Sequence, residues 1–504
     1  MKKIAVYIIL VCISCFIYAG YRNDKQTVFL TRLDDLTSIW SSARDLYGYW
    51  DQVGGTENWD CQFKEYKRQL WNCDSEYDYY LLLEKMVAEL KDGHAMVLAN
   101  FNRPSWVKEL KIAQKMRPQP LSIGHLPIGL SYIEGKYIVT ERTEDSPIPL
   151  YAEITQIEGK PTERFLDEEI SDLVGVQTDG IRQQELANRF CRSESGKRIK
   201  VTCLTKEGEV FTEKLRYASN LSAAVEEIPR KVPVGTLLYD GEYMELYDMG
   251  DVCFLKIFTL DSGKVIEEFE ADLYPHLVNF SRCVVDLREC GGGNIENGIG
   301  ILSRLIKEPI RGITQRISLK SGLEMRLARQ LEDYGDDNGG VEVQNTAILR
   351  GQEMLNGTYY YTLLSPDAYS DSMSKVIEQE LLYDEDQETV KAVPPVFTKE
   401  SCVFLIGSQT ASAGEEMALQ AQDAGITLIG SRTAGIVGDL VFECLSNGWL
   451  VGYSCGNNYG PGGEVIWNHG VVPDIEMQNT LDCIIEEGDD VLEFALNFIR
   501  KRST

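Results

Sequence analysis

Histidine is scarce in this chain of 504 residues, which contains only His94, His125, His276 and His469. Beyond the first twenty residues, no two cysteines have the C-x-x-C spacing that is typical of zinc and redox sites. Because the histidines are also scattered along the sequence, we expect no metal ion and no other cofactor. Any acid–base chemistry that uses an imidazole must come from one of these four residues.

Basic residues are also outnumbered. The chain has 50 Lys and Arg against 78 Asp and Glu, a formal net charge of −28, and no basic cluster stands out. A surface this acidic disfavours binding to nucleic acid or to an anionic membrane. We therefore expect no nucleic-acid partner and a preference for cationic over acidic substrates.

Long apolar runs are absent after the N-terminal leader. Residues 1–19 contain two lysines, an uncharged run and a small-residue site ending at Ala19, the pattern of a cleaved signal peptide. This predicts a secreted or periplasmic protein with no integral membrane span after the leader. Two alternatives stay open: an uncleaved anchor, for which an apolar stretch of about sixteen residues is short, and lipid attachment at Cys15.

The cysteines leave two alternatives. Thirteen cysteines minus the two in the leader gives eleven in the mature chain. An odd number implies at least one free thiol or an intermolecular bond. Cys61 and Cys73 are a candidate disulfide pair, and buried free thiols are the alternative.

Residues 407–417 place a serine between an apolar strand, predicted over 401–406, and a helix, predicted over 413–424. Ser412 would then sit at a helix N-terminus, where free N–H groups and the helix dipole stabilise negative charge. Acyl transfer needs such stabilisation beside its nucleophile. An ordinary N-cap serine is the alternative interpretation.

A second segment combines a strand, a glycine triplet and a helix. An apolar strand is predicted at 282–287 and a helix at 295–306, with Gly291, Gly292 and Gly293 between them. Glycines let a backbone approach a ligand closely and direct its N–H groups inward. A serine nucleophile and an oxyanion hole are thus both available in this sequence.

Five segments carry a resemblance to a known family: VAELKDGH (87–94), DLRECGGG (286–293), TASAGEEMALQAQDAG (410–425), IGSRTAG (429–435) and GVVPDIEM (470–477). Together they resemble the S41 peptidases, the tail-specific and tricorn-like serine proteases. The resemblance implies an α/β fold with a ClpP/crotonase-like core of ββα units. It also implies that Ser412 is the nucleophile and that the amides of Ala413 and Gly292 form the oxyanion hole.

The general base distinguishes the branches of this family. Tail-specific members use a lysine beyond the nucleophile, but this chain has no lysine between Lys399 and Lys501. It is therefore closer to the tricorn-like branch, which uses a histidine from a helix end. His94 follows a predicted helix at 77–91, and an imidazole with a pKa of about 6.5 is suited to this role. A purely stabilising cation at the helix end is the alternative, and His469 is the reserve candidate.

Three positions depart from the tricorn-like pattern. Gly93 stands where that branch has a serine, Trp467 lies near the place of its glutamate, and Cys290 replaces the usual asparagine of the glycine loop. The group that orients His94 is therefore open. The candidates are Glu464, Glu415 and Asp92.

A competing pattern, G-x-S-x-G at residues 452–456, is the nucleophile elbow of another hydrolase class. That elbow requires a helix directly after its serine. Residues 457–463 are rich in Asn, Gly and Pro and cannot form one. We therefore predict that Ser454 is a strand residue that leads into a glycine-rich loop.

The order of predicted elements divides the mature chain into three parts. They are an N-terminal helical domain at 28–115, a β-rich domain at 118–217 that resembles a PDZ domain, and a catalytic core at 241–498 with an acidic insertion at 317–398. In S41 peptidases such a domain binds the tail of a substrate, which adds to the edge of its sheet as an extra strand. The sequence does not indicate an oligomeric state.

These patterns together predict a secreted or periplasmic serine endopeptidase that acts on peptides or proteins, with Ser412 as nucleophile and His94 as base. The departures at Gly93, Cys290 and Trp467 keep a rival open, namely a catalytically silent peptide-binding protein on the same scaffold. A hydrolase of small peptides or esters is a third alternative.

Overall fold

The computed structural model describes residues 2–99, 120–219, 225–228, 235–311, 313–319, 352–355, 358–362 and 393–502, and the side chains of these residues outside 2–23 and 314–362. Most of the predicted acidic insertion at 317–398 lies outside the described residues.

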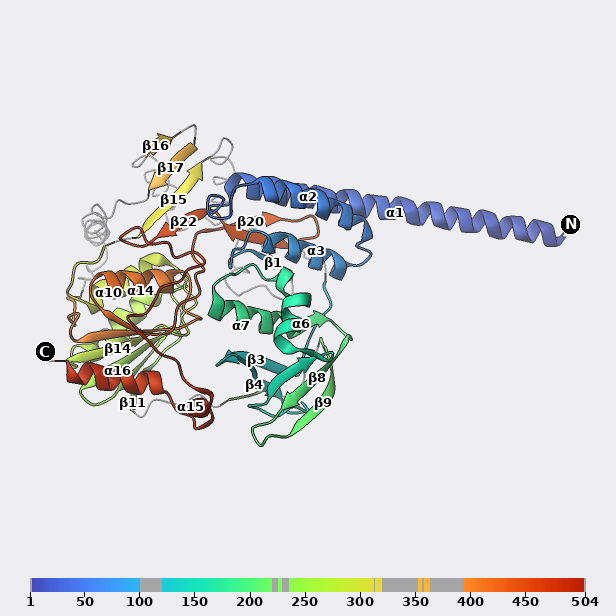
Figure 1. The fold of residues 1–504 in the computed structure, drawn as a ribbon. Helices are drawn as coiled ribbons and strands as arrows, with labels where there is room; N and C mark the ends of the chain where they lie inside the picture. The colour runs from blue at the N-terminus through green and yellow to red at the C-terminus, as the bar shows by residue number, and fades with distance from the viewer. Residues whose placement is uncertain are drawn as a thin grey trace.

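The N-terminal part is helical, as predicted (Figure 1). Its elements are α1 (Lys2–Leu46), α2 (Glu57–Gln69), η1 (Leu70–Asn72) and α3 (Glu76–Ala88). Ser75 begins α3 with a capping box, because its side chain accepts from the Asp78 N–H while the Asp78 carboxylate accepts from the Ser75 N–H. Within the described residues, no helix combines the length and apolarity needed to cross a membrane.

A three-stranded sheet connects this helical part to the C-terminal region. It contains β1 (Met96–Leu98), β21 (Leu450–Ser454) and β20 (Leu440–Cys444), in the order β1-β21-β20. The β1–β21 pair is antiparallel, with Met96 opposite Gly452. The segment from the end of α3 to β1, which includes His94, is therefore held against β21.

The middle of the chain forms a β-rich unit with two helices (Figure 1). Its main sheet has the order β10-β4-β5-β8-β9, with β3 paired to β4 and β6 paired to β5, while β2 and β7 form a separate pair. The strands are β2 (Ile123–His125), β3 (Ile128–Ile133), β4 (Lys136–Thr143), β5 (Glu153–Ile157), β6 (Lys160–Pro161), β7 (Arg192–Glu194), β8 (Arg198–Leu204), β9 (Val210–Arg216) and β10 (Val225–Glu227). The helical elements are α6 (Thr162–Glu169), η2 (Ser171–Leu173) and α7 (Asp179–Phe190), which the sequence did not predict.

The core contains a seven-stranded sheet in the order β11-β12-β13-β14-β18-β19-β23. The pairs from β13 to β23 are parallel, and β11 and β12 are antiparallel additions. The strands are β11 (Thr236–Asp240), β12 (Met244–Asp248), β13 (Val252–Ile257), β14 (Arg282–Asp286), β18 (Cys402–Ile406), β19 (Thr427–Gly430) and β23 (Ile475–Glu476). Every residue of β18 is buried, as expected for a strand covered on both faces.

Helices cover this sheet, and a smaller sheet lies beside it (Figure 1). The helical elements are α8 (Val265–Glu268), η3 (Phe269–Leu273), α9 (Tyr274–Leu277), α10 (Ile295–Leu305), α14 (Ala413–Asp423), α15 (Leu481–Ile485) and α16 (Asp490–Lys501). The smaller sheet has the order β16-β17-β15-β22 and contains β15 (Thr314–Leu319), β16 (Gln352–Leu355), β17 (Thr358–Thr362) and β22 (Gly456–Tyr459). The predicted α/β class is confirmed.

None of the eleven cysteines after the leader, all of which lie in the described part of the chain, forms a disulfide. Cys61 is exposed and Cys73 is half-buried, and neither forms a disulfide. The predicted Cys61–Cys73 pair is therefore wrong, and the free-thiol alternative is the one found. Several of the other thiols lie in the core strands, where they pack as small apolar side chains.

An arginine in the loop after β14 connects the sheet to the last helix. Arg288 binds both carboxylate oxygens of Asp286, at 3.0 and 2.7 Å, and both of Asp489, at 2.9 and 2.7 Å. Asp489 also caps α16 by accepting from the Leu492 N–H at 3.1 Å. The Arg288 guanidinium thus links α16 to the loop that contains the glycine triplet.

We predict that Arg288→Ala lowers the free energy of unfolding by about 3 kcal/mol, because it leaves two carboxylates without their counter-charge. Urea unfolding of the purified protein measures this loss. Arg500→Ala is the matched control, because Arg500 pairs with Asp251 at 2.9 Å at an exposed site and should lose less than about 1 kcal/mol. Equal losses in the two variants would contradict this account.

Candidate active site

Three neighbouring parallel strands, β14, β18 and β19, end at the same edge of the core sheet. The glycine triplet follows β14, Ser412 follows β18, and residues 431–437 follow β19. In parallel α/β sheets the carboxyl ends of the strands are where ligands and reactive groups gather. The fold therefore brings the two predicted motifs and a third loop together.

Ser412 begins α14 in an unusual backbone conformation. Its φ is 52° and its ψ is −127°, whereas an ordinary N-cap residue has extended dihedrals. A non-glycine residue held in such a region costs on the order of 1–3 kcal/mol and persists only when its surroundings enforce it. The Ser412 N–H donates to the Ile436 carbonyl at 2.8 Å and to the Glu415 carboxylate at 3.2 Å. These two bonds hold the turn.

Glu415 is fully buried directly behind this turn. Its carboxylate also accepts from the Thr433 hydroxyl at 2.5 Å, the Gly435 N–H at 2.7 Å and the Ile436 N–H at 2.9 Å. Burial raises the pKa of Glu415 to about 7, and the four hydrogen bonds act against that rise. Glu415 thus joins the Ser412 turn to the loop after β19. Its carboxylate makes no hydrogen bond to His94 in the described part of the chain.

Gly292 lies against Ser412. A Cβ atom on Gly292 would lie 2.6 Å from the Ser412 Cβ and 3.0 Å from the Ala413 nitrogen, so no side chain fits here. Its φ of +99° also favours glycine. The loop is fixed by hydrogen bonds from Ala411 N–H to the Cys290 carbonyl at 3.1 Å and from Leu260 N–H to the Gly292 carbonyl at 2.8 Å.

The two amides predicted for the oxyanion hole differ in their surroundings. Among the described residues, the Ala413 N–H has no acceptor. The Gly292 N–H has a neighbour in the thiol of Cys290. Burial raises the pKa of this thiol to about 11, although the hydrogen bond with the Gly292 amide by itself lowers the pKa.

His94 lies in the short connection between α3 and β1. Its backbone N–H donates to Asp92 Oδ1 at 3.0 Å, while Asp92 Oδ2 accepts from the Ser454 N–H at 2.9 Å. Asp92 is fully buried. Burial lowers the pKa of His94, and the Asp92 charge partly offsets this effect. The lowered pKa favours the neutral imidazole, the form that can accept a proton.

The side-chain partner of the imidazole is Ser454, a residue that the sequence assigned to no part of the site. The His94 Nδ1 lies 3.1 Å from the Ser454 Oγ. Ser454 is the last residue of β21, so its prediction as a strand residue is confirmed. No hydrogen bond joins His94 to Ser412, and His94 Nε2 has no hydrogen-bond partner among the residues that the structure describes.

One residue lies between the histidine segment and the serine turn. A Cβ atom on Gly93 would lie 2.4 Å from Ile436 Cγ1 and 2.6 Å from its Cδ1. The carbonyl of the same Ile436 accepts from the Ser412 N–H at 2.8 Å. Ile436 therefore contacts both the residue before His94 and the Ser412 turn, and its side chain explains why a glycine precedes the histidine.

The other sequence candidates lie apart from this arrangement. His469 is exposed, with its Nδ1 at 2.9 Å from the Trp467 carbonyl. Glu464 is also exposed and accepts from the Gly462 N–H at 2.8 Å within its own turn. Trp467 is buried and stacks on Tyr49, with ring centroids 4.7 Å apart. Among the described residues, no hydrogen bond joins Glu464 or His469 to the Ser412 turn.

Residues 243–477 match the family model of peptidase family S41. This part of the chain is an S41 peptidase domain. It contains Ser412, Gly292 and Ser454, whereas His94 precedes it. This match identifies the protein as a serine-type peptidase.

Two solved structures are similar to this chain over nearly its whole length. Mature CPAF complexed with lactacystin has a TM-score of 0.63 at 16% identity, over 94% of this chain and 99% of that chain. Mature CPAF has a TM-score of 0.62 at 16% identity, over 95% of this chain and 99% of that chain. At these identities the likeness establishes a common fold. No relative was found among the curated proteins.

We predict that Gly93→Ser destabilises the protein by about 1–3 kcal/mol, because the new side chain overlaps Ile436. The same substitution in an Ile436→Ala background should cost clearly less, since the overlapping atoms are then gone. A double-mutant cycle of urea unfolding measures the coupling between the two positions. Additive losses would contradict the contact described here.

Proposed function

We propose that this protein is a serine endopeptidase in which Ser412 is the nucleophile and His94 the general base. The observation that supports this most directly is the strained Ser412 turn, beside which the Ala413 amide has no acceptor among the described residues. An ordinary N-cap serine has extended dihedrals and does not need this strain.

In the first step, His94 Nε2 accepts the Ser412 hydroxyl proton while Oγ attacks the scissile carbonyl carbon. The carbonyl oxygen becomes an oxyanion, which the Ala413 and Gly292 N–H groups stabilise together with the N-terminal end of α14. Binding of the oxyanion would replace the contact of the Gly292 amide with Cys290. This step requires His94 Nε2 within hydrogen-bonding distance of Ser412 Oγ.

In the second step, the protonated imidazole donates its proton to the leaving amine, and the C–N bond breaks. The acyl group remains on Ser412 as an ester. A water molecule, deprotonated by His94, then attacks the carbonyl carbon of this ester. The bond between this carbon and Ser412 Oγ breaks, His94 returns the proton to Oγ, and the carboxylic acid product leaves the free serine. Both steps need only the residues named here.

The β-rich unit is the part that we propose holds the substrate, as a PDZ-like domain. Among the described strands, β3 pairs only with β4, so the N–H and C=O groups on its other edge can bind a peptide strand. The side chain of Gln184 on α7 occupies part of this edge. Its Nε2 donates to the Leu130 carbonyl at 2.7 Å, and its Oε1 accepts from the Tyr132 N–H at 3.0 Å.

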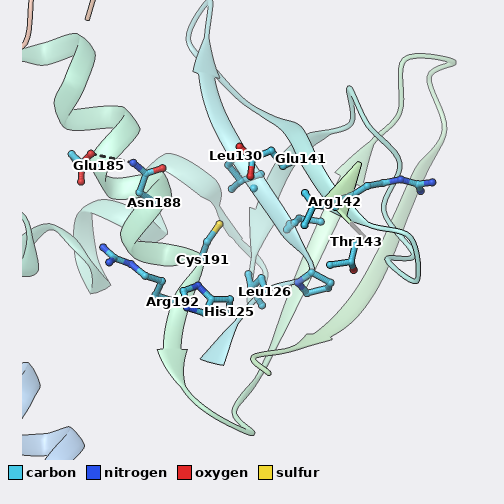
Figure 2. Close-up of a pocket in the computed structure, with 14 residues that line it drawn as sticks. His125, Leu126, Leu130, Glu141, Arg142, Thr143, Glu185, Asn188, Cys191 and Arg192 are labelled. Carbon is cyan, nitrogen blue, oxygen red and sulfur yellow. Dashed lines mark hydrogen bonds between the residues drawn. The ribbon is translucent and has the colours of Figure 1, made fainter. Parts of the chain in front are cut away.

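A pocket of about 530 Å³ lies beside the first half of β3. Figure 2 shows it between α7, which contributes Glu185 and Asn188, and the segment that contains His125 and Leu126. Arg192 also lines the pocket, and its guanidinium has no ion-pair partner among the described residues. This cation suits the carboxylate of a peptide C-terminus.

Export is the third part of the proposal. The leader at residues 1–19 supports a secreted or periplasmic location. The substrates would then be peptides or proteins in that compartment.

The mechanism predicts covalent labelling of Ser412 by a fluorophosphonate. Mass spectrometry of the labelled peptide should place the adduct on Ser412, with no labelling in Ser412→Ala and a loss of roughly a hundredfold or more in the rate for His94→Ala. Because burial lowers the pKa of His94, labelling should persist at pH 7 and decline only as the pH falls below the ordinary value of about 6.5.

Two results would contradict this mechanism. An unlabelled protein that still binds peptides would favour the silent binding protein, and a label on Ser454 would move the nucleophile to the competing site. Thermal unfolding of each variant is the control that separates lost chemistry from lost structure. Lactacystin, which is bound in one CPAF structure, is a second probe for the same serine.

Gln184 gives a separate prediction for the β-rich unit. Gln184→Ala frees the Leu130 carbonyl and the Tyr132 N–H, so peptides that add to the β3 edge should bind roughly tenfold more tightly. Fluorescence anisotropy with a labelled peptide library measures this change. Gln177→Ala is the matched control, because the Gln177 side chain donates only to the Gly175 carbonyl in its own loop. Weaker peptide binding in Gln184→Ala would indicate that this side chain is itself a peptide contact.

A further inference from the structure

We propose that Ser454 is the positioning residue that fixes the tautomer of His94, in the role that a carboxylate has in many serine hydrolases. This inference rests on the proposed function, because it concerns how His94 becomes a base for Ser412. Its evidence is independent of Ser412. It comes from a sheet register, a chain of hydrogen bonds and a buried aspartate.

His94 lies just beyond the paired part of the two strands. The register of β1 with β21 runs from Met96 opposite Gly452 to Leu98 opposite Leu450, and His94 is in the turn that precedes β1. Ser454 is the last residue of β21. The strand pairing thus brings this turn to the end of β21, where His94 Nδ1 lies 3.1 Å from Ser454 Oγ.

Asp92 fixes this pair at the backbone. Its two carboxylate oxygens accept from the N–H groups of His94 and Ser454, at 3.0 and 2.9 Å. The backbone on the other side is also held, because Gly48 N–H donates to the Ser454 carbonyl at 3.0 Å. Both partners therefore keep their separation without depending on the contact between their side chains.

A third group gives the hydrogen-bond chain its direction. The Ser454 hydroxyl lies 3.4 Å from the carbonyl of Val437, which can only accept a hydrogen bond. A hydroxyl that donates its proton to this carbonyl must accept one from the imidazole, so Nδ1 carries the proton. In a neutral imidazole, Nε2 is then the acceptor. This is the tautomer that can take a proton from Ser412.

The neighbours of Ser454 agree with this role. Ser454 is completely buried, on a strand whose residues are all buried. A buried hydroxyl without a partner would cost about 1–3 kcal/mol. Here its two neighbours, an imidazole nitrogen and a carbonyl oxygen, complete its hydrogen bonding. Among the described residues, no hydrogen bond joins the imidazole to Glu464, to Glu415 or to Asp92, whose carboxylate binds the backbone N–H groups of His94 and Ser454.

The first arm of the test is kinetic. Ser454→Ala should lower the rate of fluorophosphonate acylation at Ser412 by roughly tenfold to a hundredfold, less than the loss expected on removing a general base. Ser454→Thr keeps the hydroxyl on a β-branched side chain that suits a strand, and it should restore most of the rate. Thermal unfolding shows whether each variant is folded. A folded Ser454→Ala variant that acylates at the wild-type rate would overturn the proposal.

The second arm reads the tautomer without any activity. Long-range ¹H–¹⁵N spectra of histidine-labelled protein distinguish a proton on Nδ1 from one on Nε2, and the His94→Ala spectrum identifies the signal among four histidines. We expect the Nδ1–H form in the wild type and a shift towards a mixture in Ser454→Ala. An Nε2–H form in the wild type would overturn the proposal. A wild type with the Nδ1–H form that fails to label Ser412 would instead overturn the proposed function and leave this inference standing.

Discussion

The site depends on the pairing of β1 with β21. His94 and Ser412 are far apart in the sequence and belong to different parts of the fold. This antiparallel contact brings the end of α3 to the core, together with the Asn468 side chain, which donates to the Lys91 carbonyl at 2.7 Å. The carboxylate of Asp92 binds the backbone on both sides of the pair, so the position of the imidazole is set by main-chain hydrogen bonds. A histidine held in this way loses little further entropy when it acts as a base.

The loop at residues 433–437 shows how this chain builds its site without a lysine base. Its backbone and Thr433 donate three hydrogen bonds to Glu415, and the Ile436 carbonyl binds the Ser412 N–H. The space in front of Gly93 is filled by the Ile436 side chain. This loop contains no lysine. Its Ile436 contacts both the Ser412 turn, through the carbonyl, and Gly93, through the side chain.

Sequence reasoning recovered the local parts of this site and missed the long-range one. The strand, turn and helix around Ser412 and the glycine loop have periodicities and turn residues that short-range physics explains. The partner of His94 could not be found in this way, because it follows from the register between two strands that are distant in sequence. Ser454 was noticed only through G-x-S-x-G, a pattern that pointed to the wrong role. The helices α6 and α7 were missed for a simpler reason, since polar residues with few apolar positions gave them a weak signal.

The most direct test of the account is alkylation by a peptidyl chloromethyl ketone, because this reagent needs a nucleophilic serine and an adjacent unprotonated imidazole in the same site. With accessible thiols such as Cys61 blocked beforehand, mass spectrometry should find one alkyl group on His94, and none on His94 in the Ser412→Ala variant. Alkylation of His94 that is unaffected by Ser412→Ala, or alkylation of another histidine, would contradict the claim that Ser412 and His94 form one catalytic pair.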